Sequence, residues 1–475
     1  MPPSELLSWQ QLPLGGVVEP DIALRPLTGS YRTGLKPEAD VEKCVDCLLC
    51  WVYCPRLGRA AGRHELRRHR PRALQGLRDL RRGVPDRGDR DGGGMKARLL
   101  TGGEAVAWAM CQIDPDVVPV YPITPQTPII QHFAKHVADG EARTEVVNVE
   151  SEHSAMSAAI GSALAGARTI TATSSQGLAL MSEVVYIAAA MRAPIVVAVG
   201  NRALSGPINI HCDHSDSMLV RDSGVIQLFV EDAQEAYDTM LLAVRLSERM
   251  LLPVFVCQDG FTITHAAEPV RTIGRRRVQE WVGDYEIPFA LLDTAHPTSQ
   301  GPFAMPDYYF ELRHQQVAAM DFALPAIEEL GVELAEITGR RYGLVDAYRL
   351  DDADCAFVCL GSTAGTVKDA VDELRDQGRA VGVLRIRSFR PFPEDAIRAA
   401  LAGVSEAIVL DRADAPGARG PLYTELAAAL YGSDIALRGH VYGLGGRELH
   451  PQDVHDIFAG RYDRFVGLRS ESCLA

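Results

Sequence analysis

The chain has 475 residues, 47% of them hydrophobic and 23% charged, so it is long enough for two or three packed domains. Its formal net charge of −14 argues against a nucleic-acid partner, because phosphate contacts need a basic face. Arg192 and Pro194 interrupt the most apolar run and residues 1–16 have no basic leader, so we expect no membrane partner, no secretion signal and a cytoplasmic location.

Residues 1–55 are polar, are punctuated by proline and end in a dense cysteine motif. The stretch "CVDCLLCWVYCP" places Cys44, Cys47, Cys50 and Cys54 at the spacing C-x2-C-x2-C-x3-C-P, which is typical of ferredoxin cysteines that hold a 4Fe–4S cluster. In two-cluster ferredoxins the fourth cysteine ligates the other cluster, so a second motif should follow, and none does. The sequence therefore predicts an iron–sulfur origin for this segment, but it does not predict that a cluster forms on these four cysteines.

Residues 56–94 contain twelve arginines and no lysine, isoleucine or aromatic residue. They have neither helical nor strand periodicity, so we expect them to be disordered. Read one base further along, the codons of Leu74, Leu77, Leu80 and Val84 can all encode cysteine, at the spacing of the missing second motif. We therefore hypothesise that this segment is an out-of-frame translation. A genuine basic linker that binds RNA or an acidic partner is the alternative.

From Met95 onward, strand-like and helix-like segments alternate, as in a parallel α/β sheet. In a first unit at 95–270 the expected strands are 117–124, 144–151, 167–175, 193–202 and 252–260, and the expected helices are 127–140, 152–166, 178–191 and 232–250. Residues 271–350, which show less alternation and more proline, are expected to connect it to a second α/β unit at 351–475. In that unit we expect strands at 354–362, 380–389 and 406–413, and helices at 363–378, 393–403 and 422–432.

Ligands of open parallel sheets bind beyond the carboxyl ends of the strands, and several polar residues of the first unit fall there. They are Thr124, Glu150, Glu152, Ser174, Ser175, Gln176, Arg202 and Asp213 to Asp216. Helix capping is the simpler explanation for Ser174 and Ser175, because serine caps helices routinely. Glu152 opens a helix of small residues, where a buried carboxylate is suited to share a proton with a ligand. Arg202 follows a buried strand, where it could clamp a carboxylate or form an internal salt bridge.

Three loops carry further signals. Thr124 lies in "YPITPQTP", whose prolines forbid a regular helix, so a rigid loop presents its hydroxyl. The stretch "HCDHSD" at 211–216 has the residue types of a metal site, but adjacent ligands on so short a loop match no common zinc spacing, and we do not favour a metal there. The stretch "GSTAGT" at 361–366 could cradle a phosphate at a helix start, although a helix-packing turn is the preferred interpretation.

Long stretches of residues 95–475 closely resemble the alpha subunit of 2-oxoacid:ferredoxin oxidoreductases, with the pyruvate enzymes nearest. They include "YPITPQTPII", "NVESEHSAMSAAIGSALAGARTITATSSQGLALMSE", "GNRALSGPINIHCDHSDSM", "GPFAMPDYYFE" and "LGSTAGTVKDAVDELR". The resemblance implies a thiamine diphosphate pyrimidine-binding domain with a parallel sheet, followed by a transketolase C-terminal-like α/β domain. It also implies an enzyme that converts pyruvate and coenzyme A into acetyl-CoA and carbon dioxide and passes electrons to ferredoxin or flavodoxin.

The resemblance also assigns roles to individual residues. Glu152 matches the family glutamate that hydrogen-bonds N1′ of the cofactor's aminopyrimidine, and Thr124 and Arg202 match residues that hold the carboxylate and keto group of the 2-oxoacid. The family's diphosphate-binding domains carry a GDG sequence that helps to hold Mg²⁺, and this chain has none. A beta subunit is therefore expected to hold Mg²⁺ and the diphosphate, and this chain alone should be inactive.

Beta, gamma and delta subunits are the partners that the resemblance implies. The stretch "LTGSYRTGLKPEADVEKC" resembles the start of the family's delta subunit, a two-cluster ferredoxin, so residues 1–55 are interpreted as a truncated delta fragment joined by a frame slip to the alpha subunit. A branched-chain 2-oxoacid enzyme is an alternative, since Thr124 and Arg202 would read the common head group and not the side chain. A ferredoxin-like electron carrier on a non-catalytic scaffold is the alternative from another class.

Overall fold

The computed structural model describes Ser8, residues 10–17 and residues 95–469, and these belong to one compact unit. The predicted iron–sulfur motif at Cys44 to Cys54 and the arginine-rich segment 56–94 lie outside the described residues, as do the predictions made for them. None of the helices in the described ranges has the length and apolar character needed to cross a lipid bilayer.

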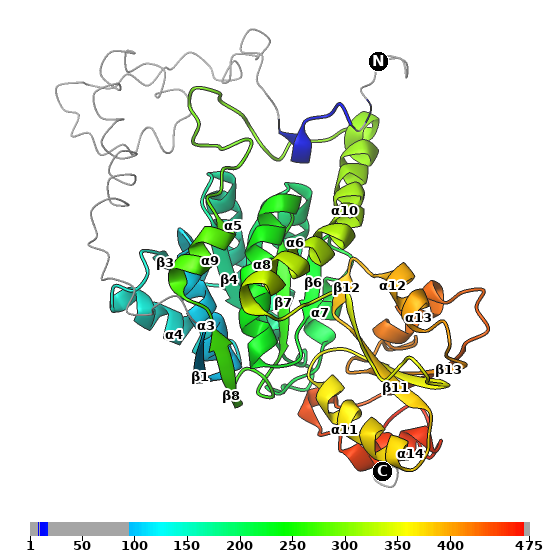
Figure 1. Ribbon diagram of the computed structural model, residues 1–475. Helices are drawn as coiled ribbons and strands as arrows, with labels where there is room; N and C mark the ends of the chain where they lie inside the picture. Colours follow the sequence, from blue (N-terminus) through cyan, green and yellow to red (C-terminus); the bar gives the residue numbers. More distant parts are fainter. Residues whose placement is uncertain (1–7, 9, 18–94, 470–475) are drawn as a thin grey trace, which may run out of the picture. The chain divides into compact units, whose positions relative to one another are not determined.

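The larger of two main sheets has seven strands in the order β12-β6-β7-β5-β4-β2-β3 (Figure 1). Their bounds are β2 Val117–Val120, β3 Glu145–Asn148, β4 Thr169–Thr173, β5 Ile195–Asn201, β6 Ile226–Phe229, β7 Val254–Asp259 and β12 Ser388–Arg390. Strands β2 to β7 run parallel, and β12 pairs antiparallel with β6. Every residue of β4, β5 and β7 is buried, as expected for parallel strands that helices cover on both faces.

Helices cover both faces of this sheet. They are α3 Gly102–Ile113, α4 Thr127–Ala138, α5 Glu152–Leu164, α6 Ser175–Ala190 and α8 Ala233–Met250. Along β5 the side chains alternate between two cores: Val196 and Ala198 pack with α3, α4 and α8, whereas Val197 and Val199 pack with α5 and α6. This alternation is the period-two pattern of a strand between two helical layers, and it confirms the predicted parallel α/β architecture.

The smaller main sheet has five strands in the order β14-β13-β10-β11-β9. Its strands are β9 Val345–Tyr348, β10 Cys355–Cys359, β11 Val381–Ile386, β13 Glu406–Asp411 and β14 Ala436–Val441, and its helices are α11 Thr363–Asp376, α12 Glu394–Ala400, α13 Pro421–Ala429 and α14 Pro451–Phe458. Four strands are parallel, and β9 is antiparallel to β11. Helices α11 and α14 lie on one face and α12 and α13 on the other (Figure 1).

The remaining elements are small, with one exception. They are η2 Leu14–Gly16, β1 Lys96–Thr101, α7 Ser215–Leu219, β8 Ala267–Thr272, α9 Arg275–Val282, α10 Pro306–Thr338 and η5 Leu444–Gly446. Strands β1 and β8 form an antiparallel pair. The exception is α10, a helix of 33 residues within the segment 271–350 that the sequence predicted only as a connection.

Two strands tie the halves of the described chain together. Strand β9 lies within 271–350 but joins the smaller sheet, and β12 lies within 351–475 but joins the larger one. Arg385 of β11 and Arg387, which directly follows β11, also bind Glu235 of α8, at 2.8 Å and 2.5 Å. Burial raises the pKa of Glu235, but these two guanidinium groups outweigh burial and hold it below its usual range. The boundary between the halves is therefore a shared core and not a flexible linker.

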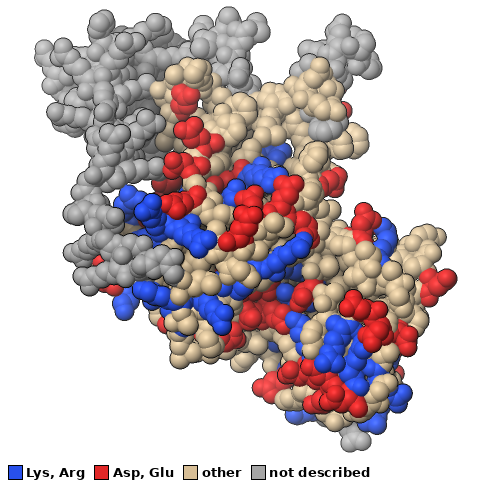
Figure 2. Space-filling model, viewed as in Figure 1, with Lys and Arg blue, Asp and Glu red and all other residues tan. Residues whose placement is uncertain are grey.

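The surface over the smaller sheet carries mixed charge. Figure 2 shows acidic and basic side chains interspersed over α11 and α14, where pairs such as Arg375–Asp352 and Arg461–Asp456 lie. Exposed pairs of this kind contribute roughly 0–1 kcal/mol each. On this face the charges therefore favour solubility more than they stabilise the fold.

Candidate active site

The three residues singled out as site candidates all lie at the carboxyl edge of the larger sheet. Thr124 is in the turn after β2, Glu152 is the first residue of α5, and Arg202 directly follows β5. Strand order explains the convergence, because the strands before them, β5, β2 and β3, lie in the run β5-β4-β2-β3 of one sheet and parallel strands end at the same edge.

Glu152 is buried, with 7% of its surface exposed, and no described residue offers its carboxylate a hydrogen bond or an ion pair. It faces Gly177 of α6 so closely that a Cβ atom at that glycine would lie 2.7 Å from Glu152 Oε1. The hydroxyls of Thr173 and Ser174, at the end of β4, are also buried without a hydrogen-bond partner among the described residues. Buried polar groups are normally satisfied, so this cluster has hydrogen-bonding capacity to offer a ligand.

Arg202 and Thr124 are in contact. The Arg202 side chain donates from Nη1 to the Thr124 carbonyl at 2.9 Å and from Nε to the Asn209 carbonyl at 2.8 Å. Its Nη2 group and the exposed hydroxyl of Thr124 make no hydrogen bond to any residue in the described ranges. Of the two roles considered for Arg202, an internal salt bridge is therefore absent from the described residues, and the guanidinium presents free donors beside the Thr124 hydroxyl.

Asp216 organises the backbone around these groups. Its Oδ2 atom accepts hydrogen bonds from the Ser175 and Arg202 amides at 2.9 Å and 3.0 Å, and Oδ1 accepts one from Asn201 Nδ2 at 2.8 Å. Burial raises the pKa of Asp216 to about 6, against the lowering effect of these hydrogen bonds. One carboxylate therefore fixes the start of α6 relative to the strand end that carries Arg202.

The capping interpretation of the two serines is wrong. Ser174 occupies the N-cap position of α6, but its side chain makes no capping hydrogen bond. The Ser175 hydroxyl donates instead to the Ala203 carbonyl at 2.6 Å, and the residue adopts a φ of 46°. Local propensity favours a cap here, but the Ser175 hydroxyl bonds to the neighbouring loop instead, and the Ser174 hydroxyl has no partner among the described residues.

The loop 211–216 brings Cys212 and His214 next to Asp259, the last residue of β7, so three metal-ligating side chains lie together. Asp259 is already fully bonded: it pairs with His214 Nε2 at 2.7 Å and Arg412 Nη1 at 2.8 Å, and accepts from Ser362 Oγ at 2.6 Å. Burial raises the pKa of the Cys212 thiol well above its usual range. Protein groups already bind both Asp259 oxygens, and the Arg412 guanidinium lies beside them, so the geometry does not favour a cation at this cluster.

The structure also shows what the turn "GSTAGT" at 361–366 binds. The Ser362 amide and hydroxyl both donate to the Oδ2 atom of Asp259, and a Cβ atom at Gly361 would lie 2.9 Å from Oδ1. This turn therefore does bind an anion at a helix start, but the anion is the protein's own carboxylate. Burial raises the pKa of Asp259, and the opposing charges of His214 and Arg412 hold it far below its usual range.

Sequence reasoning missed Asp259 and its partner Arg412. Both residues stand at or just after the carboxyl end of a parallel strand, the signal that identified Arg202. They belong to different sheets, however, and no spacing rule pairs two residues that are 153 positions apart.

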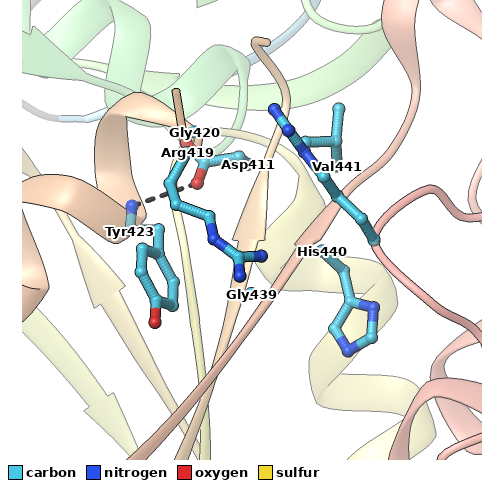
Figure 3. Close-up of a pocket in the computed structure, with 8 residues that line it drawn as sticks. Asp411, Arg419, Gly420, Tyr423, Gly439, His440 and Val441 are labelled. Atoms are coloured by element: carbon cyan, nitrogen blue, oxygen red, sulfur yellow. Dashed lines mark hydrogen bonds between the residues drawn. The ribbon is translucent and has the colours of Figure 1, made fainter. Parts of the chain in front are cut away.

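A further carboxylate, Asp411, ends β13 and accepts hydrogen bonds from the amides of Leu422 and Tyr423 at 2.7 Å and 3.0 Å. Figure 3 shows Arg419 between Tyr423 and His440 in front of it. The cavity lined by these residues measures about 10 Å³, which is room for about one water molecule. The cavity in front of Asp411 therefore has no room for a substrate.

Two family descriptions match the chain. Residues 108–330 match "Pyruvate flavodoxin/ferredoxin oxidoreductase, thiamine diP-bdg", and residues 353–454 match "Pyruvate:ferredoxin oxidoreductase core domain II". Among solved structures, the chain resembles a 2-oxoglutarate:ferredoxin oxidoreductase from Magnetococcus marinus that has 2-oxoglutarate, coenzyme A and succinyl-CoA bound. The TM-score is 0.60 at 20% identity, over 77% of this chain and 65% of that one, so this likeness concerns the fold.

Curated relatives are more similar in sequence. The chain is 52% identical over 384 residues to the pyruvate synthase subunit PorA of Thermotoga maritima, which spans 78% of this chain and 97% of the relative. It is 46% identical to the PorA subunit of Methanothermobacter thermautotrophicus, over 80% of this chain and 100% of the relative. It is also 40% identical to the ketoisovalerate oxidoreductase subunit VorA of Pyrococcus abyssi, over 76% of this chain and 92% of the relative.

Proposed function

The chain belongs to the pyruvate:ferredoxin oxidoreductase family, and we propose that it is the alpha subunit of an enzyme that oxidises pyruvate with coenzyme A. The products are acetyl-CoA and carbon dioxide, and the pair of electrons released passes to ferredoxin or flavodoxin. The observation that carries the proposal is that Glu152, Arg202 and Thr124 lie at one sheet edge, and that the Glu152 carboxylate, Arg202 Nη2 and the Thr124 hydroxyl have no hydrogen-bond partner among the described residues. We place the reaction in the cytoplasm.

Thiamine diphosphate fits the cluster around Glu152. Gly177 leaves room for the carboxylate, and the orphaned hydroxyls of Thr173 and Ser174 add hydrogen-bonding groups to the same edge. The cofactor, when bound, supplies the nucleophilic carbon that attacks the keto group of the substrate. Glu152 would hold the aminopyrimidine and its proton, because a carboxylate without a protein partner is free to accept a ring N–H.

Arg202 and Thr124 would hold the 2-oxoacid. The unused Nη2 donor of Arg202 is suited to the carboxylate and the Thr124 hydroxyl to the keto oxygen. Because both read the head group common to all 2-oxoacids, a branched-chain substrate is the second candidate, and the likeness to a ketoisovalerate oxidoreductase subunit supports it. The greater identity to pyruvate synthase subunits favours pyruvate.

The rest of the enzyme would come from other chains. Without a GDG sequence, the chain would rely on a beta subunit for Mg²⁺ and the diphosphate. A gamma and an intact delta subunit would complete the assembly, with electron transfer through the 4Fe–4S clusters of delta. Cys44, Cys47, Cys50 and Cys54 lack the companion motif that a two-cluster ferredoxin needs, so we propose that the path does not run through them.

Reconstitution tests this proposal. The full chain and a 95–475 truncation are each mixed anaerobically with separately made beta, gamma and intact delta subunits, thiamine diphosphate, Mg²⁺, coenzyme A and pyruvate, and viologen reduction is followed. Equal activity supports the proposed function and the frame slip. Activity of the full chain alone contradicts the frame slip, and reduction with 2-oxoisovalerate but not pyruvate supports the branched-chain alternative. No thiamine-dependent activity, together with stoichiometric iron on the isolated chain, supports the electron-carrier alternative.

A further inference from the structure

A short segment near the N-terminus packs against the catalytic part of the chain. Residues 10–17 contain η2, and the Leu12 carbonyl accepts a hydrogen bond from Gln315 Nε2 of α10 at 2.9 Å. Gly15 is buried, and Val17 is 4% exposed. A segment of this length buries little surface, so two buried residues and a hydrogen bond over 303 positions indicate a specific contact.

Gly15 fits this surface in a way that no other residue would. Its φ is +63°, in the region that favours glycine, and a Cβ atom would lie 2.8 Å from the Met191 carbonyl oxygen and 2.9 Å from Arg192 Cγ. Met191 ends α6, and Arg192 is itself held by hydrogen bonds to the carbonyls of Met250 and Leu251. The surface facing Gly15 is therefore rigid backbone and an anchored side chain, which cannot yield to a methyl group.

One curated relative is shorter than this chain and has no room for such a segment. The Methanothermobacter thermautotrophicus relative aligns over all of its own length with 80% of this chain, and the family matches begin at residue 108. This relative is therefore a separate polypeptide about as long as residues 95–475. It has no N-terminal segment of its own to cover the surface that corresponds to Met191, Arg192 and Gln315. In this chain the segment belongs to the same stretch, residues 1–55, as the iron–sulfur cysteine motif.

We propose that the surface formed by Met191, Arg192 and Gln315 is the docking site through which the alpha subunit holds the N-terminal segment of its ferredoxin-like subunit. Joining the two polypeptides here keeps that segment on the surface it occupies in the assembled enzyme. The proposal rests on the proposed function in one respect, which is that residues 1–55 derive from an electron-transfer subunit. It concerns binding, so it is tested without turnover.

The first test uses a fluorescent peptide of residues 1–20 and the 95–475 protein, whose folding is checked by circular dichroism. The peptide should bind saturably at one site by fluorescence anisotropy. A Gly15→Ala peptide should bind roughly tenfold more weakly or worse, because alanine is strained at positive φ and meets the Met191 carbonyl. A Gln10→Ala peptide, changed at an exposed residue, is the matched control and should bind as the parent does.

The second test uses the full chain and the subunit itself. In the full chain, Gly15→Ala should speed hydrogen exchange in α6 and α10 near Met191 and Gln315, and Gln10→Ala should not. A delta subunit made by restoring the reading frame should compete with the peptide for the 95–475 protein. This competition is measured without substrate, so a failure of the pyruvate assay would leave it standing.

Three results would overturn the proposal. The 95–475 protein could show no saturable peptide binding, the Gly15→Ala peptide could bind as tightly as the parent, or the restored delta subunit could bind without displacing the peptide. A fourth result would assign the surface differently: if the truncated protein dimerises and the peptide dissociates the dimer, the occupant is a second copy of this chain.

Discussion

The two main sheets offer the same kind of edge and use it in opposite ways. At the carboxyl edge of the larger sheet, Glu152 and the hydroxyls of Thr173 and Ser174 are buried without partners among the described residues. At the corresponding edge of the smaller sheet, Asp411 accepts hydrogen bonds from two amides of α13. The amide of Ser362 donates a hydrogen bond to Asp259. Strand polarity makes both edges suitable for anions, but the Glu152 carboxylate at the first edge has no partner among the described residues, whereas protein groups already bind Asp411 and Asp259 at the second.

The difference teaches that a ligand site is marked by unused hydrogen-bonding capacity and not by topology alone. A protein that leaves buried polar groups unpaired loses stability, so such groups persist where a ligand will satisfy them. The start of α13 binds Asp411 of the smaller sheet itself, and the turn at Ser362 binds Asp259 of the larger sheet, so the second of these contacts joins the two sheets. We therefore expect substitutions at the first edge to change activity and those at the second to change stability.

Glu152→Gln should have the largest effect on activity. Glutamine cannot take up the proton that the carboxylate exchanges with the cofactor, so kcat should fall by roughly 10²- to 10⁴-fold. Stability should not fall, because the substitution removes a buried charge that has no partner. Reconstituted pyruvate oxidation and thermal unfolding measure the two effects. Glu280→Gln, at an exposed residue of α9, is the control and should change neither kcat nor thermal stability. A loss of stability in Glu152→Gln would contradict the expectation that substitutions at the edge of the larger sheet change activity and not stability.

Asp259→Asn should have the largest effect on stability. It leaves Arg412 and His214 buried without their countercharge, and breaking a buried pair in this way costs about 3–5 kcal/mol. Denaturant unfolding of the 95–475 protein measures the loss. Glu280→Gln again serves as the control, since its exposed pair with Arg276 should contribute less than about 1 kcal/mol. Equal stability of the two variants would show that the link between the sheets is weaker than its geometry indicates.

Arg202→Lys should raise KM for the 2-oxoacid. Lysine keeps the charge but cannot bind the carbonyls of Thr124 and Asn209 and still present a donor to the substrate. The loss of a charge-assisted hydrogen bond, about 1.5–3 kcal/mol, corresponds to a rise of roughly 10- to 100-fold. Steady-state kinetics with pyruvate measure it, and an unchanged KM would remove Arg202 from the substrate site.

Asp411→Asn should change the pH dependence of stability. Burial raises the pKa of Asp411 to about 6 from the ordinary 3.8, against the lowering effect of the two amides. The pKa of Asp411 is higher in the folded protein than in the unfolded chain. The stabilisation that protonated Asp411 gives the folded state is therefore fully present below pH 3.8 and is lost as the pH rises through about 6. The advantage of wild type over the variant should therefore shrink by roughly 2–3 kcal/mol between pH 4 and pH 7. Denaturant unfolding at several pH values measures this change. Asp395 is fully exposed, so an Asp395→Asn variant is the control and should show the same pH dependence of the unfolding free energy as the wild type.

Asn209→Ala should have the smallest effect, and it tests how the second half of the chain supports the first edge. The Asn209 side chain donates to the Gly445 carbonyl at 3.0 Å, and its backbone carbonyl accepts from Arg202. Its Oδ1 atom also accepts from the His211 amide at 2.6 Å, so alanine removes two hydrogen bonds of about 1 kcal/mol each and should raise KM by roughly five- to thirtyfold without changing kcat. A fall in kcat with an unchanged KM would show that the loop acts on the chemical step and not on Arg202.

The sequence determined the architecture, and it selected candidate site residues that the fold places at one edge of the larger sheet. Alternating strand-like and helix-like segments predicted the parallel α/β units, because side-chain periodicity is a local property of the chain. Thr124, Glu152 and Arg202 could be selected because each directly follows a predicted strand. The long stretches that identify the family were also visible in the sequence. The 33-residue helix α10 was missed, because Pro325 lies inside it and its exposed face carries apolar residues.

Only the tertiary structure decided which polar groups are free and which are bound. The pairing of Asp259 with Arg412 and Ser362, the insertion of β12 into the larger sheet and that of β9 into the smaller one all join residues that are distant in sequence. No local pattern encodes such pairs, because they depend on which strand ends meet after folding. The turn at 361–366 illustrates this: the sequence indicates an anion-binding turn, and the fold places the Asp259 carboxylate of the protein in it.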